Sequence, residues 1–154
     1  MIKTQNAIKT YGFPSENPNY LTTLNLPFPV HLSWDKNVYT NKIQCHKLVV
    51  NKLGLIFKEI LDHYGLDKIK ELHIDMYGGC FNFRKMRGGS DYSRHSWGIA
   101  IDLDPERNLL HETSKTARFA RPEYKPLIDI FYKHGFVNLG VEKNYDWMHF
   151  EIKG

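Results

Sequence analysis

The chain has 154 residues, of which 42% are hydrophobic and 25% charged, and its formal net charge is +4 at pH 7. This length and balance are typical of one globular domain with its own core, so we expect a single domain over residues 1–154. The sequence has no apolar run near the roughly 18 residues of a transmembrane helix, and it has no block of basic residues. We therefore expect no membrane insertion and no nucleic-acid partner.

The first 40 residues contain four prolines, Pro14, Pro18, Pro27 and Pro29. Proline and the neighbouring asparagines favour turns, which predicts an irregular, Pro-rich lead-in over residues 1–40. The same segment is rich in aromatic and large aliphatic side chains that a disordered tail lacks, so we expect it to pack on a core formed by residues 41–154. It also lacks the apolar stretch of a secretory signal, so we expect no signal peptide.

Two periodicities follow along the chain. Between residues 41 and 64 the apolar side chains recur at steps of three and four, which predicts a helix that Gly65 caps. Residues 72–77 alternate between apolar and polar side chains, as a half-buried strand does. Gly78 and Gly79 then open a loop that extends to about Tyr92.

The last third of the chain predicts four more elements. Residues 99–103 alternate again and indicate a core strand, which an irregular connection follows. Pro122 suits the first turn of a helix that extends to about His134. Residues 136–139 and 147–152 are predicted strands with a turn between them. Together the elements predict an α+β fold, in which a small antiparallel sheet has helices packed on one face and a cleft on the other.

Three side chains with the chemistry of metal ligands are His95, Asp102 and His149. Because alternate residues of a strand share a face, Asp102 and His149 on neighbouring strands can project together into a cleft, while Ile101 and Phe150 face the helices. Two imidazoles and one carboxylate form an open zinc site whose fourth position is left for water. The sequence therefore predicts zinc as the cofactor, with these three residues as its ligands.

The surroundings of the three residues support this assignment. His95 lies before the strand, in a loop that Gly98 helps to bend back. Asp146, three residues before His149, is a spare carboxylate that can accept a proton from the water, although a turn or capping role for it stays open. The other six histidines are interpreted as surface or packing residues: His31, His46, His63, His73, His111 and His134.

Over roughly residues 40–152 the sequence resembles a known family, the LAS zinc peptidases. This family includes D-Ala-D-Ala carboxypeptidases, the L-Ala-D-Glu endopeptidases of phage endolysins and the hedgehog signalling domain. The segments that carry the resemblance are Ser93-x-His95-x-x-Gly98-x-Ala100-x-Asp102, Asp146-x-x-His149 and Gly78-Gly79-x-x-x-x-Arg84.

The resemblance implies a LAS/hedgehog-type fold and roles for four more residues. Asp146 would be the catalytic base, at a position where many members carry Glu and endolysin-type members carry Asp. Arg84 would stabilise the developing oxyanion or bind a substrate carboxylate, and Arg87 is an alternative for the same role, with a solvated loop position open for both. Ser93 would bind the substrate or orient the His95 loop.

The function that the resemblance implies is hydrolysis of peptidoglycan stem peptides, most like that of an endolysin-type L-Ala-D-Glu endopeptidase. A D-Ala-D-Ala carboxypeptidase is the close alternative, and a zinc-containing binding module without catalysis is the alternative of another class. We expect a monomer whose partner is the stem peptide. We also expect it to stay in the cytoplasm until phage-type lysis releases it to the cell wall, or to be carried on a virion. Trp97 and Trp147 are interpreted either as walls of the cleft or as core residues.

Overall fold

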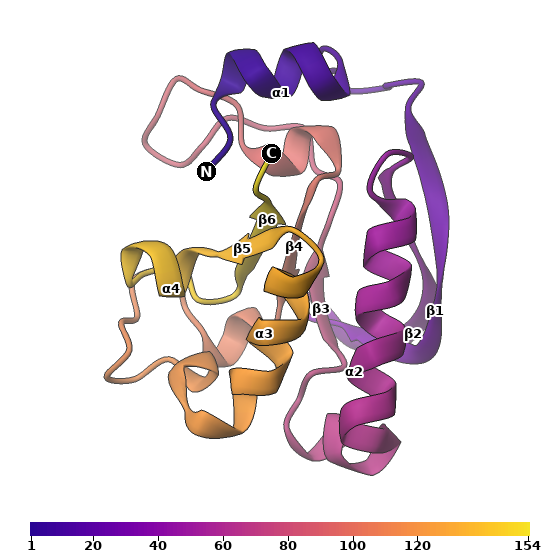
Figure 1. Ribbon diagram of the computed structural model, residues 1–154, viewed down its shortest axis with the longest axis vertical. Helices are drawn as coiled ribbons and strands as arrows, with labels where there is room; N and C mark the ends of the chain where they lie inside the picture. The colour runs from indigo at the N-terminus through magenta and orange to yellow at the C-terminus, as the bar shows by residue number, and fades with distance from the viewer.

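The computed structural model describes residues 1–154 and is built on a six-stranded sheet with the order β2-β1-β3-β4-β6-β5 (Figure 1). Every neighbouring pair is antiparallel except β1 and β3, which are parallel, so the sheet is mixed. The expectation of a purely antiparallel sheet was wrong at this pair, because a long helix carries the chain from β2 back across the sheet before β3. The strands are β1 (Leu21–Leu32), β2 (Asp35–His46), β3 (Met76–Gly79), β4 (Ala100–Leu103), β5 (Phe136–Asn138) and β6 (His149–Ile152).

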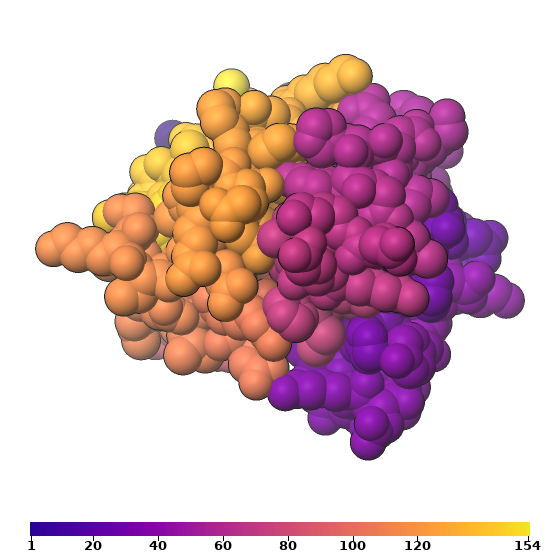
Figure 2. All heavy atoms as spheres, turned by 90° about the horizontal axis from the view of Figure 1, so that it is seen from below, coloured from indigo at the N-terminus to yellow at the C-terminus, as the bar shows by residue number.

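Two helices cover one face of this sheet. They contact each other, α2 packs on β1 and α3 packs on β5, and Figures 1 and 2 show the two helices side by side. The ring of Phe131 in α3 stacks on Phe150 of β6 with 3.9 Å between centroids, which fixes the apolar face of β6 toward the helices. No helix combines the length and the apolar character that crossing a membrane requires. The four α-helices are α1 (Thr4–Tyr11), α2 (Val50–Glu71), α3 (Lys125–Lys133) and α4 (Leu139–Lys143).

The prediction of an irregular lead-in over residues 1–40 was wrong for most of this segment, which forms α1, β1 and the start of β2. Only short stretches are irregular, chiefly residues 12–20 with Pro14 and Pro18. In β1 burial alternates from Leu24 to Val30, so its apolar residues lie in the core as those of an ordinary strand do. Pro27 and Pro29 occupy the exposed positions of this alternation, where the register with β2 is interrupted and the ladder needs no backbone N–H from them.

The predicted and observed bounds of the helices and strands differ most in the middle of the chain. Residues 41–46 belong to β2, whereas the predicted helix begins only at Val50 and continues to Glu71. Gly65 kinks this helix (φ 74°, ψ 160°) instead of ending it, because a further turn buries Ile69. The segment 72–75 is consequently a turn, and β3 is shorter than the strand predicted there.

The predicted elements of the last third are found within about three residues of their expected bounds. The turn predicted between β5 and β6 contains α4, which the side chain of Asn138 caps by accepting the N–H of Val141 at 3.1 Å. One hydrophobic cluster of 34 buried residues contains side chains from Ile2 to Ile152, so both ends of the described chain contribute to the same core.

Candidate active site

The pairing of β4 with β6 places Asp102 directly opposite His149. Ile101 and Phe150, the next pair along, are fully buried on the helix side, so Asp102 and His149 project from the opposite face. Gly78 of β3 makes room for this arrangement, because a Cβ atom there would lie 2.9 Å from the Cβ of Asp102.

His95 reaches the same point from a short 3₁₀ helix, Arg94–Trp97. The Oγ of Ser93 caps this helix by accepting a hydrogen bond from the backbone N–H of His95 at 3.2 Å. Gly98 ends it in the left-handed conformation (φ 69°), and a Cβ atom there would lie 2.9 Å from the backbone N of His46. The bend expected at Gly98 therefore requires glycine both for its backbone conformation and for the space that it leaves.

The three side chains form one cluster, in which their candidate ligand atoms lie within 4.8 Å of one another. The Oδ1 atom of Asp102 is 3.2 Å from Nε2 of His95 and 3.1 Å from Nδ1 of His149. The Nδ1–H of His95 donates to the backbone carbonyl of Cys80 at 2.8 Å, which leaves the Nε2 lone pair facing the cluster. This Nε2 atom is buried and makes no hydrogen bond, so the donor set fits a divalent ion of the zinc type.

The electrostatics of the cluster suit a cation. Burial acts to raise the pKa of Asp102, but His95 and His149 hold this pKa well below its usual range. Burial acts to lower the pKa of His149, but hydrogen bonds with Asp102 and Glu151 raise it to about 10. The cluster thus attracts a proton in the place where a metal ion would bind, and metal binding would release that proton.

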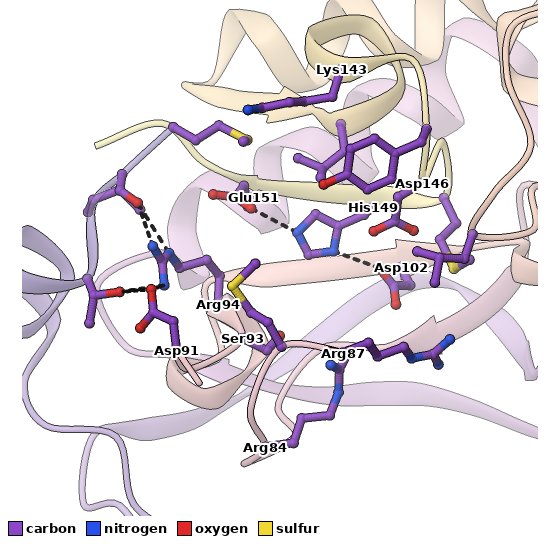
Figure 3. A pocket seen from close by; sticks show the side chains of 18 of the residues that line it. Arg84, Arg87, Asp91, Ser93, Arg94, Asp102, Lys143, Asp146, His149 and Glu151 are labelled. Atoms are coloured by element: carbon purple, nitrogen blue, oxygen red, sulfur yellow. Dashed lines mark hydrogen bonds and ion pairs between the residues drawn. The ribbon is translucent and has the colours of Figure 1, made fainter. Parts of the chain in front are cut away.

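Asp146 lies in the same cleft, where its side chain is half-buried. Its backbone adopts the left-handed conformation (φ 54°), and its N–H donates to the carbonyl of Leu110 at 2.8 Å. In Figure 3 its carboxylate lies beside His149 and Asp102. Burial raises the pKa of Asp146, while His149 acts to lower it and Asp102 to raise it. A carboxylate in this position, beside the candidate metal site but outside its donor set, is placed to accept and return a proton.

Two cavities adjoin at this cluster. The larger, of about 900 Å³, extends from Asp146 and His149 to residues 1–5. The smaller, of about 760 Å³, extends along residues 105–116. Five residues line both cavities, so the groove continues on two sides of the cluster: Arg87, Asp102, Leu110, His111 and Met148.

The N-terminal residues that line the larger cavity are held in place by Arg94. Its guanidinium donates to the carbonyl of Ile2 at 2.8 Å and to the Oγ of Thr4 at 3.2 Å. Figure 3 shows Arg94 at the end of the cavity opposite Asp146. The first 40 residues were expected to pack against the core, and residues 1–5 also form part of the wall of the cleft.

The loop side chains predicted from the sequence also line the larger cavity, namely Arg84, Arg87 and Ser93. Figure 3 shows both arginines on the side of Asp102 away from β6. Of these three residues, only Arg87 lines both cavities, and its charge acts to lower the pKa of Asp146 against the effect of burial. Ser93 caps the helix of His95, so of the two roles considered for it the geometry favours orientation of the His95 loop.

Sequence reasoning overlooked two residues near the site, Glu151 and Ser96, and left the positions of His111 and Trp97 open. Glu151, buried on the same face of β6 as His149, accepts a hydrogen bond from its ring at 3.0 Å. The Oγ of Ser96 accepts the N–H of Arg84 and donates to its carbonyl, which fixes the backbone at Arg84. No sequence pattern indicated this contact. His111, interpreted as a surface or packing residue, is exposed but lines both cavities. Trp97 is fully buried, which favours the core interpretation over the cleft wall.

Trp147 is likewise buried and covers Gly140, where a Cβ atom would lie 1.9 Å from the indole ring. Neither tryptophan lines either cavity.

Comparison with known proteins gives one family match. Residues 87–152 match a family model described as D-alanyl-D-alanine carboxypeptidase. This segment contains the three residues of the cluster and Asp146. Comparisons with curated proteins and with solved structures give no match.

Proposed function

We propose that this chain is a zinc-dependent peptidase that hydrolyses the stem peptides of peptidoglycan. The match of residues 87–152 to a family model described as D-alanyl-D-alanine carboxypeptidase supports this proposal. The observation that carries this proposal is the cluster of His95, Asp102 and His149, with Asp146 beside it in an open cleft. These are the residue types that a hydrolytic metal site combines: three ligands and a carboxylate that is free to act as a base.

Each residue of the cleft has a separate role in the proposed reaction. When bound, zinc supplies a Lewis acid and lowers the pKa of water to about 7. Asp146 accepts the proton of the attacking water and returns it to the departing amine, a task that its position in the cleft beside His149 and Asp102 supports. Arg87 or Arg84 stabilises the charge that develops on the peptide oxygen or binds a substrate carboxylate.

For the bond that is cut, we propose L-Ala-D-Glu. The groove continues on both sides of the cluster, which leaves room for substrate residues on both sides of the scissile bond. An endopeptidase needs such a groove, whereas a carboxypeptidase needs room for only one residue beyond the bond. The aspartate at position 146, as in endolysin-type members of the family, favours the same choice.

The description of the matched family favours a second candidate, a D-Ala-D-Ala carboxypeptidase. Its substrate ends in a carboxylate, which the arginines that line the cleft can bind. On either proposal the substrate is in the cell wall. We propose that the enzyme reaches it after release from the cytoplasm by phage-type lysis, or as part of a virion.

Digestion of purified peptidoglycan sacculi by the zinc-loaded protein tests these alternatives. Mass spectrometry of the fragments should reveal new amino-terminal D-Glu, and the Asp146→Asn variant should release it at least about 100-fold more slowly. Free D-Ala would instead establish the carboxypeptidase. If a protein with stoichiometric zinc releases no fragment at all, the peptidase proposal is wrong and a binding module without catalysis becomes the better account.

A further inference from the structure

Glu151 is a buried carboxylate that no part of the proposed reaction uses. It follows His149 by two positions in β6, so both side chains project from the cleft face of the strand. Glu151 is 5% exposed and His149 is 7% exposed. Glutamate is rarely buried to this extent unless it has a partner, and its partner here is His149.

The contact between them is specific. The Nε2 atom of His149 lies 3.0 Å from Oε1 of Glu151, while Nδ1 on the other side of the ring lies 3.1 Å from Asp102 (Figure 3). The side chain of Glu151 makes no other hydrogen bond and no ion pair with a lysine or arginine. Because the ring separates Glu151 from the cluster, the carboxylate is placed to hold the imidazole and not to bind the ion itself.

We propose that Glu151 is the positioning residue of the metal centre. It accepts the Nε2–H of His149 and thereby keeps the Nδ1 lone pair directed at the ion that Asp102 and His95 also face. The inference rests on the proposed function, since it assumes that the cluster is a metal site.

The other imidazole of the cluster is held in the same way. His95 donates its Nδ1–H to the carbonyl of Cys80, so each ring has one nitrogen on the protein and the other on the cluster. Such a contact fixes the tautomer and orientation of the ligand and raises its basicity. A carboxylate does this more strongly than a carbonyl, and its negative charge also favours a cation nearby.

Zinc affinity measured by competition with a chromogenic chelator tests the proposal without any substrate. Glu151→Met removes the acceptor while keeping a side chain of similar length, and zinc affinity should fall about 10–100-fold. Glu151→Gln keeps an acceptor oxygen without the charge, so its loss should be several-fold and smaller than that of the Met variant.

Asp75→Asn is a matched control, because Asp75 is also a buried carboxylate beside a histidine, with 3.7 Å to His31, but lies outside the cleft. Its zinc affinity should equal that of the unsubstituted protein. Unchanged zinc affinity in a folded Glu151→Met variant would overturn the proposal, and so would an equal loss in the Asp75 control. If the Met variant does not fold, unchanged affinity in Glu151→Gln is decisive against it.

The outcome is separable from that of the proposed function. A protein that binds zinc tightly but cleaves no peptidoglycan still tests Glu151, because affinity is read without turnover. A chain whose unsubstituted form binds no zinc overturns both inferences together.

Discussion

At Asp146 a single backbone conformation directs the proposed catalytic base into the cleft. Its positive φ is uncommon outside glycine, and Asp and Asn are among the residues that tolerate it best. The left-handed turn, tied to Leu110 by a backbone hydrogen bond, points the carboxylate into the cleft three residues before His149. A substitution at this position therefore tests the chemistry of the side chain only if the new residue also tolerates the left-handed backbone conformation.

We predict that Asp146→Asn keeps the fold and the zinc but loses turnover. Asn tolerates the left-handed conformation and has the same shape, but it cannot accept a proton, so kcat should fall by about 10²–10⁴. Zinc content by atomic absorption and kcat on a synthetic stem peptide check this. Near-normal kcat in the variant would remove Asp146 from the mechanism.

The two loop arginines should differ in importance. Arg87 lines both cavities and influences Asp146, whereas Arg84 lines only the larger cavity. We expect Arg87→Ala to lower kcat/KM by about 10²-fold and Arg84→Ala to lower it less, since one lost donor to a developing charge costs about that much. Steady-state kinetics of both variants decide the order, and a larger loss for Arg84→Ala would reverse our assignment.

The 3₁₀ helix of His95 is held by contacts from distant parts of the chain. Gly98 ends it against β2, and the carbonyl of Cys80 orients its histidine. Position of the ligand thus depends on close packing of three segments.

We predict that Gly98→Ala destabilises the protein and weakens zinc binding together. The new Cβ would contact the backbone N of His46 at 2.9 Å in a conformation that alanine disfavours, at a cost of about 1–3 kcal/mol. Ala100→Gly, on the adjacent strand, provides a control for a small change without this contact. Urea unfolding measures the stability and chelator competition measures the zinc affinity of both variants. A Gly98→Ala variant that is less stable but binds zinc as tightly as the unsubstituted protein would show that the two effects are not coupled.

The attachment of α1 to the sheet should depend on pH through His46. The Nε2–H of this buried ring donates to the carbonyl of Tyr11, and its Nδ1 accepts the N–H of Leu48. Because a nitrogen that accepts carries no proton, the folded state requires the neutral form of His46. Burial lowers the pKa of His46, outweighing the Tyr11 hydrogen bond that raises it. The unfolded chain therefore binds a proton that the folded chain does not, and stability is complete above pH of about 6.5 and is lost as the pH falls below it.

Melting temperatures from pH 8 to pH 5 test this dependence. The unsubstituted protein should lose more stability over this range than His46→Gln, which cannot take up the proton. Parallel pH curves for the two proteins would contradict it.

The metal cluster joins segments that are far apart in the chain, the loop of His95 and the strands β4 and β6. Since the three ligands converge only in the folded state, zinc should stabilise the protein as a whole. At a free zinc concentration 100 times Kd we expect about 2.7 kcal/mol, or a rise in Tm of about 5–10 °C. A chelator should reverse the rise, and His149→Ala should show none. A Tm independent of zinc would indicate that the cluster does not bind it.

Much of the metal cluster was predictable because it depends on local rules. Strand alternation alone places Asp102 and His149 on one face, opposite Ile101 and Phe150, and the register confirms it. The glycine at position 98 likewise indicates a bend by itself. The first 40 residues were not predictable in this way, because their prolines suggest turns, and only pairing with β2 and burial on α2 make β1 a strand.

The sequence by itself determined the residue types of the candidate site: two imidazoles and a carboxylate, their spacing, and a second carboxylate three residues before the second histidine. These are properties of side chains and of short-range periodicity, which need no knowledge of distant contacts. Tertiary structure decided what those side chains face. It brought residues 1–5 to the wall of the cleft, gave Arg87 a place on both cavities, and set Glu151 against His149. Such neighbours arise from packing between segments remote in sequence, and no local pattern encodes them.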